Sequence, residues 1–61
     1  MNNLKRARKK KKLTQKAVAD ALNITTHRYK EIENNPLCAT PTIMRDISSL
    51  LGVSISYIFL P

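Results

Sequence analysis

Apolar residues recur at helical intervals along this chain and divide it into five segments. Residues three or four positions apart share a face of a helix, because each residue turns the backbone by about 100°. This spacing predicts helices over about residues 2–11, 15–22, 26–34 and 41–51, and a last short helix after Ser54. The residues expected to face inward are Leu4, Ala7, Val18, Ala19, Leu22, Tyr29, Ile32, Ile43, Met44, Ile47, Leu50, Leu51, Ile55, Ile58 and Phe59. The chain has one glycine and no hairpin signal, so an all-α fold is expected.

Capping residues mark where these helices begin and end. Hydroxyl side chains that can accept a hydrogen bond from the first helical turn stand at Thr14, Thr25, Thr40 and Ser54. Asn23 follows the last apolar residue of the second helix, where a left-handed backbone conformation would begin a tight turn. Gly52 should end the fourth helix, and the prolines at 36 and 41 predict an irregular segment over residues 35–40.

The length and the charge narrow the range of functions. Sixty-one residues suffice for a single small domain, residues 1–61, with a thin core and no room for a large internal active site. Eleven Lys and Arg against four Asp and Glu give a formal net charge of +7, which calls for a polyanionic partner. Nucleic acid is the leading candidate because binding to phosphates releases counterions, and an anionic membrane surface is the second.

The composition argues against several other classes of protein. With one cysteine, Cys38, and one histidine, His27, the chain can form neither an internal disulfide nor a Cys/His zinc site. We therefore expect no metal, no cofactor and no enzymatic activity. The longest uncharged stretch, residues 47–61, is interrupted by Gly52, so no transmembrane helix is expected. The N-terminus lacks the apolar core of a secretory signal, which favours a cytoplasmic location.

Two short helices joined by a tight turn, over about residues 15–34, form the helix-turn-helix pattern on a strongly basic chain. In this motif the second helix enters the major groove of DNA. A small residue, Ala19, allows the two helices to approach closely, and Asn23 stands where the turn needs a left-handed residue. The pattern therefore predicts sequence-specific binding to double-stranded DNA.

The chain resembles the Cro and phage-repressor family, also called lambda repressor-like or XRE-type, from Leu4 to Phe59. The matching stretches are residues 4–8, Leu13-Thr14-Gln15, the core from Ala19 to Leu22, Ile32-Glu33 and Leu51-Gly52-Val53-Ser54. The resemblance implies a compact five-helix DNA-binding domain, with a buried ion pair between Arg8 and Glu33. The chain departs from the family at Lys12 and Asn23, where glycine is usual, and at Tyr29, where a β-branched aliphatic residue is usual.

The third helix carries the candidate base contacts. Its inward residues turn Lys30 outward together with His27 and Glu31. The resemblance assigns base-edge contact mainly to Thr25, Thr26, His27 and Glu31. The chemistry agrees, because a threonine methyl can touch thymine, a histidine can donate to guanine, and a carboxylate can accept from cytosine. An alternative is that His27 and Glu31, four residues apart, pair with each other.

Phosphate contacts are expected on either side of that helix. The resemblance assigns them to Gln15, Arg28 and Asn34, and Lys16 lies beside Gln15. The end of the first helix should lie near the DNA backbone, where lysines would add affinity independent of sequence. The segment before the fourth helix lacks the arginine and lysine of many relatives, so hydroxyls and amides at a helix N-terminus would act there. The remaining candidates are Lys9, Lys10, Lys11, Lys12, Thr40 and Thr42.

These observations predict a transcriptional regulator of the repressor type, of phage or mobile-element origin, whose partner is a double-stranded DNA operator. A homodimer, at least on DNA, would match a near-palindromic site. Its candidate surface is the apolar C-terminal end, Tyr57, Ile58, Phe59 and Leu60, although closing the core competes for the same residues. Two alternatives stay open: an antitoxin-like or anti-repressor module whose main partner is another protein, and a basic protein acting on RNA or an anionic membrane.

Overall fold

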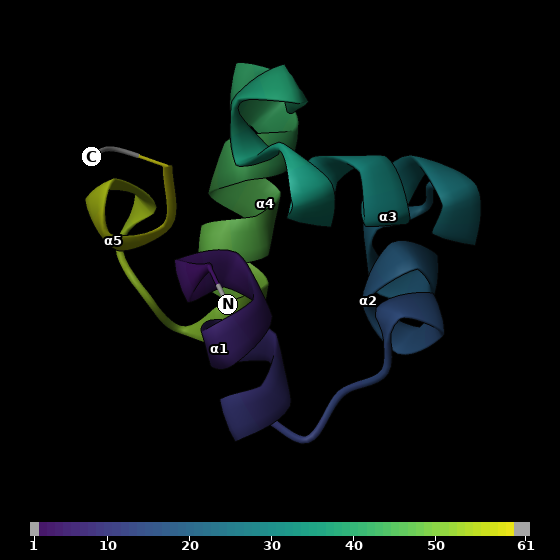
Figure 1. The fold of residues 1–61 in the computed structure, drawn as a ribbon, viewed down its shortest axis with the longest axis horizontal. Coiled ribbons are helices and arrows are strands. Elements are labelled where there is room, and N and C mark those ends of the chain that lie inside the picture. Colours follow the sequence, from purple (N-terminus) through teal and green to yellow (C-terminus); the bar gives the residue numbers. More distant parts are fainter. Residues whose placement is uncertain (1, 60–61) are drawn as a thin grey trace.

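The computed structural model describes residues 2–59, and its helices lie where the apolar pattern predicts them (Figure 1). The elements are α1 (Asn3–Lys10), α2 (Gln15–Leu22), α3 (Thr26–Asn34), the 3-10 helix η1 (Pro36–Cys38), α4 (Pro41–Leu51) and α5 (Ile55–Phe59). No strand occurs between residues 2 and 59. The all-α fold class is confirmed, and the expected irregular segment contains a single helical turn.

The predicted capping residues define the helix boundaries. The hydroxyls of Thr14, Thr25 and Thr40 each accept a hydrogen bond from the backbone amide three residues later, at 3.0 to 3.2 Å. The Ser54 hydroxyl does the same for α5, at 3.2 Å from the amide of residue 57. Asn2 caps α1, which the apolar pattern did not predict. Each cap satisfies an amide that has no partner inside its helix, so each helix begins at a fixed residue.

The core lies between all five helices. Its most completely buried apolar side chains are Leu4, Val18, Ala19, Tyr29, Ile32, Ile47 and Leu51. Leu50 and Ile55 belong to the apolar repeat but are 36% and 37% exposed. For Leu50 the reason is angular: the buried face of α4 runs through Ile47, Ser48 and Leu51, and Leu50 lies about 100° away from its centre.

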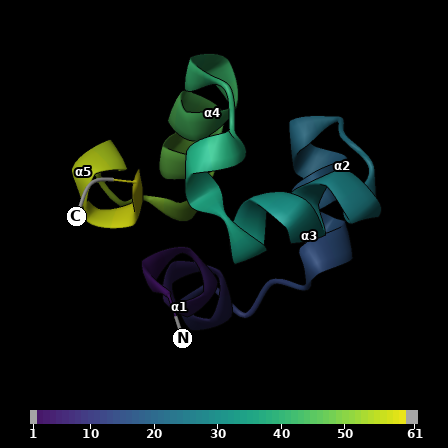
Figure 2. The ribbon, with the colours of Figure 1, turned by 45° about the horizontal axis from the view of Figure 1, so that its top comes forward.

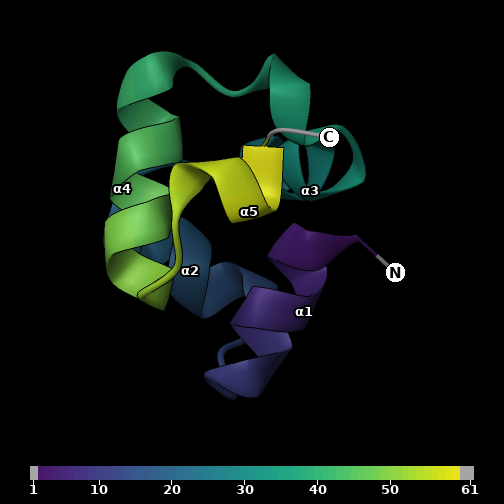
Figure 3. The same cartoon turned by 90° about the vertical axis from the view of Figure 1, so that its left-hand side faces the viewer.

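The helices surround this core without forming layers. In Figure 1, α4 stands between α5 on one side and α2 with α3 on the other. The turned view shows α1 closing the remaining side (Figure 2). The segment from α3 to α4, which includes η1, crosses one end of the molecule (Figure 3). This arrangement leaves one side of α3 uncovered by any other helix.

Candidate nucleic-acid interface

The turn between α2 and α3 fixes how α3 is presented. Asn23 has the predicted left-handed conformation, with φ 59°, and the amide of Ile24 donates to the carbonyl of Ala19 at 3.0 Å. Ala19 is fully buried between the helices, where its small side chain lets the two backbones approach. These features hold α3 against α2 at one angle, as a helix-turn-helix requires.

The two sides of α3 differ sharply in burial. Tyr29 and Ile32 point into the core and are fully buried. The opposite side consists of exposed or half-buried polar residues: Thr25, Thr26, His27, Lys30, Glu31 and Asn34. The rest of the described chain therefore leaves the polar side of α3 open.

The outward side chains of α3 have no partner in residues 2–59. The side chains of His27, Lys30, Glu31 and Asn34 make no hydrogen bond or ion pair there, so the alternative pairing of His27 with Glu31 is not formed in this structure. Together they offer donors and acceptors of the kinds that base edges and phosphates bind. All of the expected base-contact residues lie on this one side or at its N-terminal end.

A buried ion pair ties α1 to the end of α3. Arg8 Nε donates to Glu33 Oε2 at 2.8 Å, and Arg8 Nη2 donates to Oε1 at 3.0 Å. Arg8 Nη1 also donates to the carbonyl of Leu13 at 2.7 Å. This is the pair that the resemblance implies, and its two-pronged geometry is the strong form of an arginine–carboxylate contact.

The charges of this pair stabilise each other. Burial alone would raise the pKa of Glu33, but the hydrogen bonds and charge of Arg8, together with Tyr29 and Gln15, outweigh burial and hold that pKa below its usual value. The same hydrogen bonds raise the pKa of Arg8. The buried hydroxyl of Tyr29 lies beside the pair without a hydrogen-bond partner of good geometry in residues 2–59. Its burial, and then the carboxylate of Glu33, raise the pKa of this phenol.

Gln15 links the first residue of α2 to the same carboxylate. Its Nε2 donates to Glu33 Oε1 at 3.2 Å. An amide nitrogen carries two protons, so one donor remains for a phosphate. Beside it, Lys16 Nζ lies 3.0 Å from Asp20 in an exposed ion pair, a contact that contributes little to stability. The N-terminus of α2 and the C-terminus of α3 thus meet at Glu33.

The basic run at the end of α1 is divided between two sides of the molecule. Lys9, Lys10, Lys11 and Lys12 are all exposed. At about 100° per residue, Lys9 lies next to Arg8 around α1 and away from the buried face of the helix. Lys10 faces α5 instead, and Lys11 lies beside Gly52. The expected contact of these four lysines with DNA stays a prediction, and in the structure Lys10 and Lys11 lie beside α5 and the end of α4.

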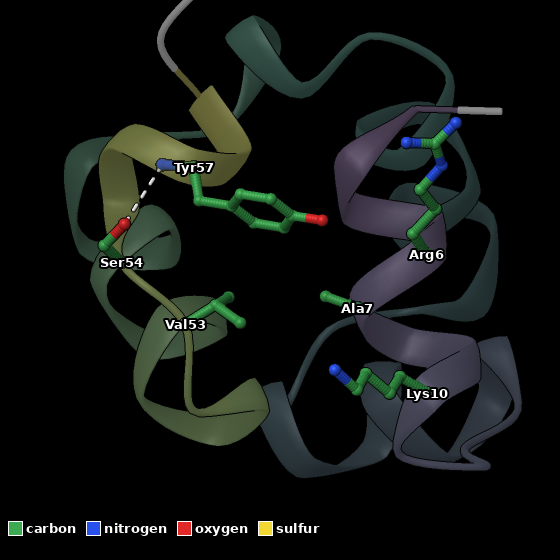
Figure 4. A pocket seen from close by; sticks show the side chains of 6 residues that line it. All are labelled: Arg6, Ala7, Lys10, Val53, Ser54 and Tyr57. Atoms are coloured by element: carbon green, nitrogen blue, oxygen red, sulfur yellow. Dashed lines mark hydrogen bonds between the residues drawn. The ribbon is translucent and has the colours of Figure 1, made fainter.

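Figure 4 shows the groove that receives Lys10, which has a volume of about 410 Å³. It lies between α1 and α5, and Ala7, Val53 and Tyr57 supply its apolar surface. Arg6 and Lys10 stand along its α1 side. The groove is on the side of the molecule away from α3, and sequence reasoning did not identify it because its residues come from distant parts of the chain.

The segment before α4 lies against Arg28 of α3. Thr40 and Thr42 are exposed at the N-terminus of α4, as a phosphate contact there would require. Arg28, expected to contact phosphate, donates from Nη2 to the carbonyl of Cys38 at 3.1 Å in the absence of DNA. The guanidinium of Arg28 therefore lies toward η1, away from the open side of α3.

The expected dimer surface is largely used by the molecule itself. Ile58 and Phe59 are buried in the core, and Leu60 lies outside the described residues. Tyr57 is 44% exposed. Leu37, in η1, is 68% exposed and lies beside a groove of about 440 Å³ that Ile58 and Phe59 also line. Sequence reasoning missed this residue because an isolated apolar side chain in a loop has no periodic signal.

The described residues offer neither a metal site nor a membrane span. Residues 2–59 contain no cluster of three side chains suited to holding a metal ion. None of the helices in that range has the length and apolar character of a membrane span.

Comparison with known proteins identifies the motif. A family model described as helix-turn-helix matches residues 4–58. No curated protein and no solved structure matches the chain. The matched range begins at the buried Leu4 and ends in α5, so it covers the ion pair and both helices of the motif.

Proposed function

Because the chain belongs to the XRE-type, lambda repressor-like helix-turn-helix family of DNA-binding transcription regulators, we propose that it is a repressor that reads an operator in the major groove with α3. The observation that carries this proposal is the open polar side of α3, whose outward side chains have no partner within residues 2–59. A major groove about 12 Å wide admits one helix, and α3 is the helix whose polar side stands free.

The proposal divides the surface by chemistry. Base edges contact Thr25, Thr26, His27, Lys30 and Glu31, because these side chains lie along the open side of α3 or at its start. Phosphates contact the residues around that side, namely Lys9, Lys12, Gln15, Lys16, Asn34, Thr40 and Thr42. Lys10 and Lys11, which face α5 and α4, add only to the long-range attraction of a basic surface for DNA.

We further propose that the chain is a repressor of the Cro type, of phage or mobile-element origin. It acts in the cytoplasm and binds DNA as a homodimer. A two-fold dimer would match a near-palindromic operator. The surface that supports pairing is the exposed Leu37, which shares a groove with Ile58 and Phe59 of α5. Sedimentation of the chain with and without a two-half-site duplex tests this part, and Leu37→Ser should weaken binding to two half-sites more than to one.

Selection of bound sequences from a random duplex pool tests the main proposal. We expect the wild-type chain to enrich a defined site, and His27→Ala to change the preferred base at one position of that site. Lys9→Gln should weaken binding to all sequences about equally and flatten the logarithmic salt dependence by roughly 0.9. Arg6→Gln, which removes the same charge on the side away from α3, is the matched control. If His27→Ala and Glu31→Ala both leave the preference unchanged, α3 is not the base-reading helix.

A second candidate function is favoured by the groove between α1 and α5. Its cations, Arg6 and Lys10, have no acidic residue on either helix to pair with, and its floor is apolar. That combination complements an acidic segment of a partner protein, as an antitoxin-like or anti-repressor module would need. Affinity purification with the wild-type chain and with Arg6→Glu tests this second function. If the wild type captures a partner that Arg6→Glu loses, and binds DNA without sequence preference, the second function replaces the repressor proposal.

A further inference from the structure

Arg28 stands on the flank of α3 that faces η1. Its guanidinium donates from Nη2 to the carbonyl of Cys38 at 3.1 Å, and Nη1 lies 3.6 Å from the sulfur of the same residue. We infer that Arg28 is a positioning residue that clamps the segment between α3 and α4 against α3. The inference rests on the proposed function, because it assigns Arg28 a role in placing one DNA-contacting element relative to another.

The clamp has a second connection through the cysteine. Cys38 Sγ donates to the carbonyl of Glu31 at 3.8 Å. Arg28 and Glu31 are three positions apart, so Cys38 is held along a single turn of α3. Within residues 2–59, these contacts are the only side-chain hydrogen bonds between α3 and the segment over residues 36–40.

Apolar burial supplies little of the attachment. Leu37 and Cys38 are exposed, and Ala39 is the one buried side chain of the segment. The backbone hydrogen bonds made by the amides of Cys38 and Ala39 run to Asn35 and Pro36, within the segment and its immediate start. Without the guanidinium, the position of the segment relative to the middle of α3 would depend mainly on Ala39 and on the weak contact from Cys38 Sγ to the carbonyl of Glu31.

The clamp matters for DNA because α4 begins directly after it. Thr40, the N-cap of α4, is two residues beyond Cys38. A shift of Cys38 would therefore move the first turn of α4, where hydroxyls and amides are proposed to meet phosphate, relative to the base-contacting side of α3. An arginine is suited to this task because its planar fork holds two acceptors at a fixed separation, which a lysine ammonium does not.

Two substitutions separate positioning from direct phosphate contact. Arg28→Lys keeps the charge but loses the fork, and Arg28→Gln loses both. For a positioning residue, both variants should weaken binding to the selected operator by about tenfold, with the salt dependence unchanged. For a phosphate contact, Arg28→Lys should bind almost as well as the wild type, and Arg28→Gln should flatten the logarithmic salt dependence by roughly 0.9. The second pattern would overturn the inference.

Amide hydrogen exchange of the free protein tests the clamp without DNA. Arg28→Gln should speed exchange at Cys38 and Ala39 by about tenfold or more, while amides in α1 and α2 exchange as in the wild type. Arg6→Gln is the charge-matched control and should leave residues 38 and 39 unchanged. Unchanged exchange in Arg28→Gln would refute the clamp even if the chain binds DNA. Faster exchange in a chain whose wild type selects no DNA site would keep the clamp and refute the proposed function.

Discussion

Two residues carry backbone conformations that ordinary L-residues adopt at a cost. Lys12 and Asn23 both have φ 59°, and glycine is the usual family residue at each. Asparagine tolerates this left-handed region because its short polar side chain bonds locally, whereas lysine has no such compensation. The strain of the turn between α1 and α2 is therefore concentrated at Lys12.

Lys12→Gly should stabilise the protein. Removing the side chain relieves the left-handed conformation, and part of the gain is offset by the greater freedom of glycine in the unfolded chain. We expect the free energy of unfolding to rise by about 0.5 to 1 kcal/mol in urea titrations. Arg6→Gly, in the middle of α1, is the control and should lose about 1 kcal/mol. A loss in both variants would show that Lys12 is not strained.

Glu33 makes stability depend on acid. Its pKa is lowered in the folded protein below the ordinary value of 4.5. The unfolded state therefore binds a proton first as the pH falls, so the stabilisation is fully present above about pH 5 and is lost progressively below pH 4.5. Chemical denaturation between pH 7 and pH 3 should show this decline. Glu33→Gln should start from a lower stability and decline less, and an equal decline would assign the effect to other carboxylates.

Among the elements, helix boundaries were the most predictable feature. Thr14, Thr25, Thr40 and Ser54 each act on the turn that follows them, so their effect is local and visible in the sequence. The direction of long side chains was not predictable, because it depends on neighbours from elsewhere in the chain. Arg28 turned to Cys38, and Lys10 turned to Tyr57 and Val53, for reasons of tertiary packing.

The same distinction between local features and side-chain contacts holds for the candidate site. The open side of α3 followed from the inward spacing of Tyr29 and Ile32, while the pairing of Arg8 with Glu33 came from the resemblance. The exposure of Leu37 had no local signal. Apolar periodicity thus predicts which side of a helix is exposed. The contacts of each flanking side chain can be identified only from the tertiary structure.

Helix α4 carries a serine hydroxyl on its buried face. The hydroxyl of Ser48 is buried without a hydrogen-bond partner in residues 2–59. Ser48→Ala should remove this cost and improve helix propensity, raising the free energy of unfolding by about 1 to 1.5 kcal/mol. Ser49→Ala, on the exposed side of the same helix, should gain only about 0.5 kcal/mol from propensity. Equal gains in thermal unfolding would indicate that the Ser48 hydroxyl is satisfied in solution.

For the whole molecule, the net charge of +7 opposes compactness as well as attracting DNA. Only two ion pairs occur between residues 2 and 59, and one of them is exposed. Most of the cations therefore have no paired carboxylate and repel one another, and salt can screen this repulsion.

The unfolding midpoint of the free protein should rise with salt. Between about 20 and 200 mM NaCl, screening should raise it by roughly 2 to 5 °C. Lys9→Gln, which removes one cation from the cluster at the end of α1, should show a smaller rise. A midpoint that falls with salt would mean that attraction, not repulsion, dominates the charge interactions of the folded state.

The contact of Arg8 and Gln15 with Glu33 has a consequence for engineering. Residues 14–35 contain both helices of the motif but not Arg8, so an excised peptide would carry the Glu33 carboxylate without its main counter-charge. If α2 and α3 were moved into another protein, an arginine in the position of Arg8 would have to be supplied by a neighbouring helix. A fragment that keeps this ion pair would have to include α1 as well as α2 and α3.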